Sequence, residues 1–373
     1  MFEFSAGWIS LKDRTLIQVT GSDALHFLQG QLTFDLLTLG PDNFGWAAHC
    51  TPKGKVLFTA LIVKTGETFL LDAAIGMSDP ILSRLRPFIL RSKVRIEEAH
   101  AHFSAVGLMG RDLEEGAKSA GLSPLPAVGR QDERSGLLRL RLSPDRLMII
   151  ASPERLAELP APSALPSQSW ELGNVREGIA EVTPLTTDRY IPQWLNWDRI
   201  GGISFRKGCY TGQEIVARTH YLGKVKRRAL HIALDSAVPV GTSILRGGEV
   251  TGEVFSCVEN EQGGYEGLAI IAGEEPSDLV IEGAPPPGPA HPPAALCPVC
   301  LTEHGNPPAS GTALADPWLP APRHCRSVRP ARVYRSTRTG QAHHRDQSAR
   351  LFSRDVACPT STSDPRSSHR SDP

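Results

Sequence analysis

The chain has 373 residues, which is enough for two or three domains. Its 40 basic and 40 acidic residues cancel, so the total charge predicts neither a nucleic-acid partner nor an acidic membrane partner. The charge is unevenly distributed, because residues 285–373 hold eleven Arg, no Lys and six acidic residues, whereas residues 1–284 are mildly acidic.

The cysteines and the N-terminus indicate a cellular compartment. Seven Cys are scattered without a paired framework, and three of them, Cys50, Cys209 and Cys257, precede the basic tail. This pattern is typical of a reducing compartment. The first residues form neither a secretory signal nor a transit peptide, and no stretch approaches the roughly 20 apolar residues of a spanning helix. We therefore expect a soluble cytoplasmic protein with no membrane contact.

The first 160 residues mix strand and helix patterns. Ser22 or Asp23 follows the first strand and is expected to cap the next helix, and Pro87 is expected to end its helix early. The predicted strands are 15–20, 44–49, 56–64, 68–73, 93–98, 103–108, 137–142 and 146–151, and the predicted helices are 23–32, 81–90, 111–120 and a short one from residue 153.

The later residues change from mixed to all-β patterns. Residues 170–179 predict a helix, and 184–199 a long loop whose aromatic residues Tyr190, Trp194 and Trp197 are interpreted as core residues. Short strands are predicted over 229–234, 243–246, 249–258 and 267–272, which indicates a small antiparallel barrel or sandwich. We expect an α+β fold with two subdomains over residues 1–222 and a C-terminal antiparallel β-barrel over 223–284.

The tail over residues 285–373 lacks hydrophobic periodicity and is rich in Pro, Arg and Ser. We expect it to be disordered, and its lack of Lys raises the hypothesis of a frame-shifted segment. Cys297 and Cys300 have the spacing of half a zinc site, but no apolar scaffold surrounds them. No metal site is therefore predicted.

One stretch, residues 206–214, combines a thiol with two glycines, two cations, an amide and a carboxylate. The spacing of Thr211 and Glu214 predicts a capping box that opens a helix from Gly212 to about Thr219. Cys209 would then lie just ahead of a helix N-terminus, where a lowered thiol pKa is favoured. The alternative is a Gly-rich turn with a buried and inert Cys.

The same stretch carries a family resemblance. The run Lys207, Gly208, Cys209, Tyr210, Thr211, Gly212, Gln213 and Glu214 resembles the signature of the YgfZ family, which is related to the T-protein (aminomethyltransferase) of the glycine cleavage system. Three further stretches agree in order, namely residues 21–33, 47–55 and 201–205, and the resemblance covers about residues 8–275.

The resemblance implies a T-protein-like fold whose domains surround a central channel that holds tetrahydrofolate or a derivative. It implies a cytoplasmic folate-binding protein that supports iron–sulfur cluster assembly or repair in client enzymes, including those of tRNA modification. Expected partners are folate, iron–sulfur client enzymes and assembly proteins. A lone Cys209 cannot hold a cluster that needs four ligands, so no resident iron–sulfur cluster is predicted.

Three residues are implied to bind the folate. Trp170 matches a family tryptophan, and its flat ring can stack on a pterin. Arg14 stands where the family has a second tryptophan, and it can stack on a ring or meet the folate carboxylates. Arg176 occupies the place of a family acidic residue two positions before Gly178.

Two other functional classes remain open. One is a tetrahydrofolate-dependent one-carbon enzyme, but Phe58 and Thr59 stand where a T-protein has its catalytic carboxylates, so aminomethyl transfer is not expected. The other is a scaffold whose Cys209 is structural. We expect a protein that is not a classical enzyme and whose functional thiol is Cys209.

A basic run, residues 224–228, follows the signature helix. It can attract a polyglutamyl folate tail, an acidic protein or RNA, or it can be a solvated strand entry. No aromatic residues are interleaved with its cations, so no direct nucleic-acid binding is predicted.

Overall fold

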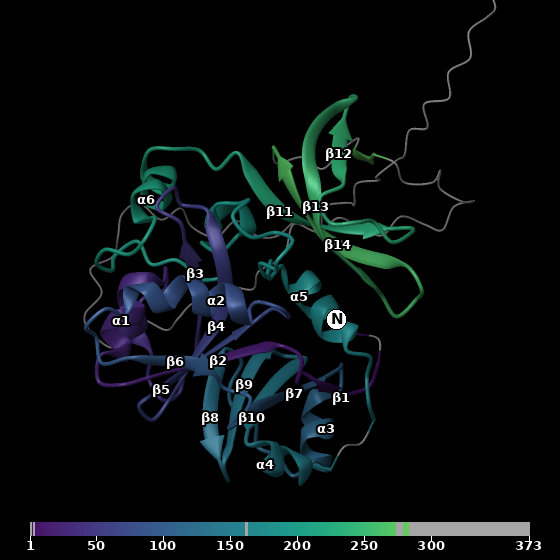
Figure 1. Cartoon of the computed structure of the whole chain (residues 1–373). Coiled ribbons are helices and arrows are strands. Elements are labelled where there is room, and N and C mark those ends of the chain that lie inside the picture. The colour runs from purple at the N-terminus through teal and green to yellow at the C-terminus, as the bar shows by residue number, and fades with distance from the viewer. Residues whose placement is uncertain (1, 3, 161–162, 274–278, 283–373) are drawn as a thin grey trace, which may run out of the picture. The chain divides into compact units, whose positions relative to one another are not determined.

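The computed structural model describes residues 2, 4–160, 163–273 and 279–282, which form three five-stranded antiparallel sheets with short helices around them (Figure 1). We call them the N-terminal, middle and C-terminal sheets. The basic tail, with its predicted disorder and its Cys297 and Cys300, lies outside the described residues. None of the helices in the described part of the chain is long and apolar enough to cross a membrane.

The N-terminal sheet has the strand order β3-β4-β5-β2-β6. Side chains alternate between its faces, as in any strand, and both faces are buried. Phe58, Ala60 and Ile62 of the central strand β4 pack with the helices, whereas Leu61 and Val63 face the middle sheet. The elements are β2 (Thr15–Thr20), α1 (Ala24–Gln31), η1 (Leu36–Thr38), β3 (Gly45–Cys50), β4 (Val56–Thr65), β5 (Thr68–Ala73), α2 (Ser78–Leu85), η2 (Arg86–Phe88) and β6 (Arg95–Glu98).

The middle sheet has the strand order β1-β7-β10-β9-β8 and is also covered on both faces. In β10, Met148 and Ile150 pack toward the N-terminal sheet, whereas Leu147 and Ile149 pack with α3. The two sheets therefore stack face to face between outer helices. The elements are β1 (Gly7–Ser10), β7 (Ser104–Met109), α3 (Leu113–Ser119), β8 (Arg130–Arg134), β9 (Leu137–Ser143), β10 (Arg146–Ala151) and α4 (Pro153–Ala157).

The C-terminal sheet has the strand order β11-β14-β13-β12-β15 and curls into a half-barrel (Figure 1). A register shift between Val254 and Ser256 marks a bulge in β13, which increases the local twist. The preceding segment holds α5 (Gln168–Glu177), η3 (Pro192–Leu195) and α6 (Gln213–Tyr221), and the strands are β11 (Arg227–Leu234), β12 (Ser243–Arg246), β13 (Glu249–Glu259), β14 (Tyr265–Ala272) and β15 (Leu279–Ile281).

The sequence predicted most of these elements to within a few residues. The mixed α/β class and the antiparallel C-terminal module are confirmed, although edge strands β11 and β15 are not paired with each other in the described residues. Strand β8 was missed because all five of its residues, 130–134, are polar. Pro87 ends its helix early, since α2 stops at Leu85 and a 3₁₀ turn follows. The domain boundary at residue 222 stays a prediction.

The prediction that the side chain of Ser22 or Asp23 caps α1 is wrong. Asp23 occupies the cap position, but its side chain makes no capping hydrogen bond. Its Oδ2 instead accepts a hydrogen bond from the backbone N–H of Lys93 at 2.7 Å. The carboxylate thus ties the start of α1 to the segment that precedes β6, because a distant backbone donor competes with the helix terminus for it.

Candidate functional site

The signature loop, residues 204–212, leads into helix α6 and packs against the turn that joins β3 to β4. Gly212 has φ +84°, and a Cβ there would approach the carbonyl oxygen of Thr51 to 2.5 Å. Gly54 of the turn has φ +72°, and a Cβ there would meet Ile215 of α6 at 2.8 Å. Both positions combine a left-handed backbone with no room for a side chain, so the loop and the turn depend on glycine.

This close contact overturns the predicted capping box. The residue at the helix cap is Gly212, not Thr211, and no side chain caps the first turn. Because Gly212 enters the helix in a left-handed conformation against Thr51, the Thr211 side chain is not at the capping position. Glu214 lies in the first turn of α6, where its negative charge interacts favourably with the positive end of the helix dipole.

The side chain of Lys207 holds the signature loop against the end of helix α1. Its Nζ atom donates hydrogen bonds to three backbone carbonyl oxygens, those of Gln29, Leu32 and Phe34, each at 2.7 Å. These carbonyls lie in the last turn of α1 and just after it, so a buried ammonium closes that helix end. Desolvation lowers the pKa of Lys207 to about 8, so the amine is still charged at neutral pH.

Thr33 joins three further segments at the same place. Its Oγ1 donates to the carbonyl of Gly202 at 2.6 Å and accepts from the backbone N–H of Ala48 at 2.9 Å. Its carbonyl accepts from the N–H of Ser204 at 2.9 Å. The four stretches that carried the family resemblance, far apart in sequence, therefore meet around the signature loop.

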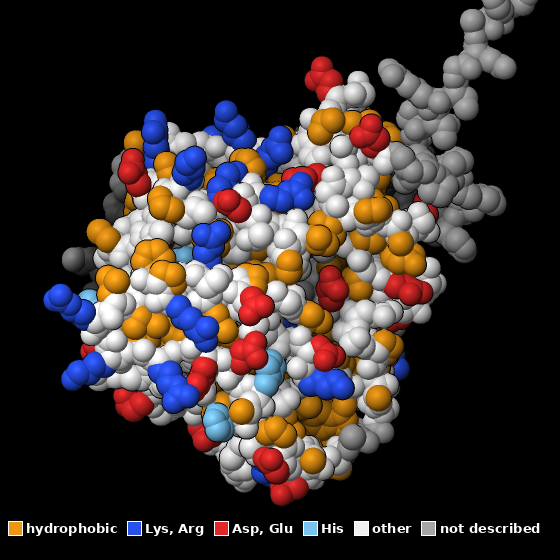
Figure 2. Space-filling model, in the orientation of Figure 1, with side chains coloured by type: hydrophobic (Ala, Val, Ile, Leu, Met, Phe, Trp, Pro, Cys, Tyr) orange, Lys and Arg blue, Asp and Glu red, His pale blue; other side chains and the backbone are white. Residues whose placement is uncertain are grey.

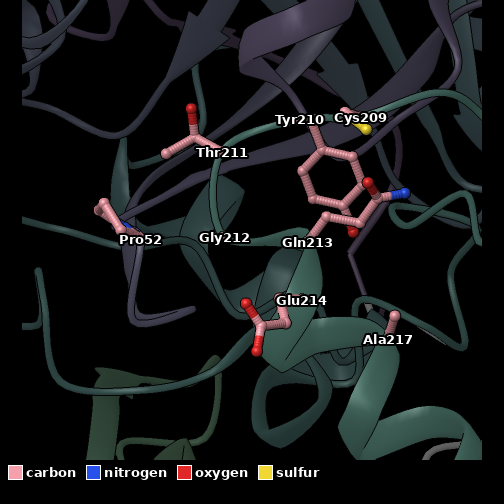
Figure 3. Close-up of a pocket in the computed structure, with 8 residues that line it drawn as sticks. All are labelled: Pro52, Cys209, Tyr210, Thr211, Gly212, Gln213, Glu214 and Ala217. Carbon is pink, nitrogen blue, oxygen red and sulfur yellow. The ribbon is translucent and has the colours of Figure 1, made fainter.

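Cys209 is exposed at the tip of this loop, beside a hollow of about 530 Å³. Figure 3 shows its sulfur near the Tyr210 ring, with the Glu214 carboxylate directed away from it. The hollow is lined by Pro52, Cys209, Tyr210, Thr211, Gly212, Gln213, Glu214 and Ala217. The alternative of a buried Cys209 is therefore wrong, whereas the reactivity and the functional role of the thiol stay predictions.

Two groups beneath the hollow are buried and differ from Cys209. Burial raises the pKa of the Cys50 thiol to about 12, so this cysteine stays a neutral apolar residue. Burial also raises the pKa of Tyr210, whose hydroxyl has no hydrogen-bond partner among the described residues. The Gln213 amide donates to the Lys207 carbonyl at 3.5 Å. Of the three thiols in the described residues, Cys209 is the one that the structure exposes.

The residues implied to bind folate are held in ion pairs or covered. Arg14 is buried and meets both Asp72 (2.7 Å) and Glu181 (2.6 Å). Although burial opposes its charge, these two carboxylates raise the pKa of Arg14. Arg176 pairs with Glu261 and Glu266, each at 2.6 Å, and so joins α5 to the C-terminal sheet. Neither guanidinium is left free for a folate carboxylate in this arrangement.

Trp170 lies in the first turn of α5 and is buried in the core. The guanidinium carbon of Arg146 lies 4.2 Å from the centre of its ring, and a Cβ on Gly107 would touch the ring at 2.6 Å. Arg146 is itself held by Glu177 and Asn174 at 2.8 Å each. A pterin could stack on Trp170 only if Arg146 moved aside, so this role stays a prediction.

Sequence reasoning missed an acidic cluster on and just after α5. Glu171 is exposed, and desolvation together with the neighbouring Glu181 raises the pKa of its carboxyl. Asn174 links the cluster to Arg14, because its amide donates to Glu181 at 2.6 Å. The lone Asp72 in the apolar strand β5 was the signal that could have revealed this network.

The comparisons with known proteins identify the family. The sequence matches none of the protein-family models. It is 32% identical to the tRNA-modifying protein YgfZ of Shigella sonnei, over 61% of this chain and 72% of that protein. It is also 32% identical to the tRNA-modifying protein YgfZ of an Enterobacter species, over 68% and 82%. The chain belongs to the YgfZ family.

The fold has a solved neighbour. The glycine cleavage system aminomethyltransferase T from Bartonella henselae superposes with a TM-score of 0.58 over 72% of this chain and 78% of that one, at 16% identity. This likeness confirms the predicted T-protein-like fold and carries nothing about the activity of the chain.

Phe58 and Thr59 both contribute contacts to the folded core. Phe58 is buried and stacks on His49 with ring centres 5.1 Å apart. The Thr59 hydroxyl accepts a hydrogen bond from the backbone N–H of Val182 at 2.8 Å. Neither side chain can supply the carboxylate that the aminomethyltransferase alternative requires at these positions.

Proposed function

We propose that this chain is a folate-binding protein that supports the synthesis or repair of iron–sulfur enzymes, including tRNA-modifying ones, through Cys209. One observation carries the proposal: a buried ammonium and two glycines without room for a side chain fix a loop whose tip holds an exposed thiol. A loop that only connects two elements has no need of so many constraints. Fixed presentation of a reactive group does need them.

The thiol acts as a transient holder of sulfur or iron, or as a partner in thiol exchange. A single cysteine provides one ligand, so a bound species leaves easily for a client protein. The hollow beside Cys209 gives a partner group room to approach. The client enzymes, and assembly proteins that deliver to them, are the proposed partners, and the cytoplasm is the proposed compartment.

The chain's own residues fit tetrahydrofolate in one respect. A pterin carries an amino group and a ring N–H that donate hydrogen bonds, and Glu171 offers an accessible carboxylate. Glu171 lies on helix α5, next to Trp170 in the sequence. We place the folate in a central channel beside this carboxylate, with Trp170 at its wall.

Replacement of Cys209 by Ser tests the thiol. Because the side chain is exposed and forms no hydrogen bond in the described structure, we expect the Ser variant to fold with an unchanged melting temperature. In cells that lack the native gene, the activity of iron–sulfur enzymes should be at least about tenfold lower with the variant than with the parent protein. Cys257→Ser is the matched control and should restore it. Full restoration by Cys209→Ser would remove the thiol from the mechanism.

Calorimetric titration with tetrahydrofolate tests the cofactor. The parent protein should bind it, and Glu171→Gln should weaken binding about tenfold, because the amide is a weaker acceptor than the carboxylate. Glu115→Gln, an exposed change on α3, is the control and should bind as the parent does. The folate proposal fails if the parent shows no heat of binding, and the placement fails if Glu171→Gln binds normally.

A further inference from the structure

A cationic surface surrounds helix α6. Between residues 206 and 228 the chain has seven Lys or Arg and a single acid, Glu214. The fold uses two of these cations internally, since Lys207 binds the end of α1 and Arg228 pairs with Asp198 at 2.6 Å. The remaining ones are exposed or half-buried and form no ion pair within the described structure. With one cation of the β3–β4 turn they form what we call the α6 surface: Lys55, Arg206, Arg218, Lys224, Lys226 and Arg227.

Figure 2 shows the same concentration of charge. Lys and Arg side chains outnumber Asp and Glu over the region that α6 and the start of β11 occupy in Figure 1. Like charges so close together repel one another. Desolvation is the main cause of the lowered pKa of Lys55, the nearby Asp188 opposes it, and Arg227 adds a smaller repulsion that lowers the pKa further. A polyanion bound on this surface would relieve the repulsion.

Aromatic rings lie among these cations in space, although they do not in sequence. Trp194 lies between two of them, with Lys55 Nζ at 4.8 Å and the Arg227 guanidinium at 5.4 Å from its ring centre. Phe205, next to Arg206, stacks on His220 at 3.8 Å. Tyr221 follows His220, and its side chain is 64% exposed.

The pattern fits a single strand of nucleic acid better than a protein. Phosphates and bases alternate along a single strand, and here aromatic rings lie among the cations. The exposed large apolar side chains at this end of α6 are Tyr221 and Leu222, which is too little for the apolar centre of a stable protein interface.

We propose that the α6 surface binds a single-stranded stretch of nucleic acid. The cations contact successive phosphates, and the exposed Tyr221 ring stacks on one base. The surface begins at Arg206, three residues from Cys209, so a bound strand lies close to the signature loop. This binding is independent of folate and of thiol chemistry.

Fluorescence anisotropy with labelled 15-residue oligonucleotides tests the proposal. Full-length protein should bind oligo-U and oligo-dT, with affinity that falls as salt rises. Lys224→Ala/Lys226→Ala should reduce the slope of log K against log salt by about 1.4, because each contact with a single-strand phosphate contributes about 0.7. Tyr221→Ala should weaken binding about tenfold and leave the slope unchanged, because stacking releases no counterions.

The full chain carries the basic tail, so the comparison is between variants that share it. Lys118→Ala on α3 and Phe88→Ala in η2 are exposed control changes of the same kinds and should bind as the parent does. Stronger binding of oligo-U than oligo-dT identifies RNA as the ligand, and the reverse identifies DNA. The proposal is overturned if the α6 variants keep the parent's affinity and slope, or if poly-L-glutamate competes as well as oligo-U, which would identify an acidic protein as the partner.

Discussion

Lys207→Met should lower the free energy of unfolding by about 3 kcal/mol at pH 7. The variant leaves three buried carbonyl oxygens, those of Gln29, Leu32 and Phe34, without their donor. An unsatisfied buried acceptor costs about 1–3 kcal/mol, and partial access of water to the helix end should offset part of the total. Urea denaturation followed by circular dichroism measures the change.

The same variant should release the signature loop. The lysine side chain makes three of the hydrogen bonds between this loop and the end of α1, so Cys209 should lose its fixed position. Amide hydrogen exchange of residues 204–212 should rise with the loss of stability. Lys226→Met, an exposed change on the α6 surface, should alter stability by less than about 0.5 kcal/mol. Equal stability of Lys207→Met and the parent would show that the ammonium does not hold the loop.

Arg14→Met should lower the free energy of unfolding by about 3–5 kcal/mol at pH 7. Arg14 is the shared partner of Asp72 and Glu181, and its removal leaves two carboxylates in the interior without the cation that contacts them. The second change Asp72→Asn should recover a large part of the loss, because it removes one of the two charges. A double variant no more stable than Arg14→Met would contradict this account of the network.

The loss in Arg14→Met should depend on pH. Burial already raises the pKa of Asp72, and Arg14 opposes that effect, so the pKa should rise further in the variant. A carboxyl whose pKa is higher in the folded than in the unfolded chain favours the folded state as pH falls toward its unfolded value. The difference between variant and parent should therefore shrink from pH 7 to about pH 5. Arg95→Met, which breaks an exposed ion pair with Glu97, should show no such trend.

The sequence predicted the strands that are buried on both faces, because such strands appear as mainly apolar runs. Residues 56–64 and 68–73 are apolar on both faces, and their strands lie between a helical layer and a second sheet. The polar edge strand β8 carries no such pattern. It pairs with one strand, β9, and water can hydrogen-bond to the backbone groups of its other edge. The capping prediction at Thr211 failed because spacing along the sequence carries no information about contacts with a distant segment, here the carbonyl of Thr51.

Some features of the candidate site could likewise be predicted from the sequence, and others could not. The signature by itself located the candidate loop and its thiol, Cys209. Only the tertiary structure decided that Lys207 is a clamp on α1 and that Arg14 is held by two carboxylates. The partners of these side chains lie 58 to 178 residues away in the sequence, and no local pattern records such contacts.

The sequence therefore determined the elements, the family and the position of the thiol, because hydrophobic periodicity and a short motif are local properties. The tertiary structure decided which polar groups are used within the fold and which stay accessible. It closed the guanidinium groups of Arg14 and Arg176 into ion pairs, left Glu171 accessible and brought Trp194 beside Lys55. The physical reason is that buried charges must be paired, and only the packed chain shows which of them found a partner.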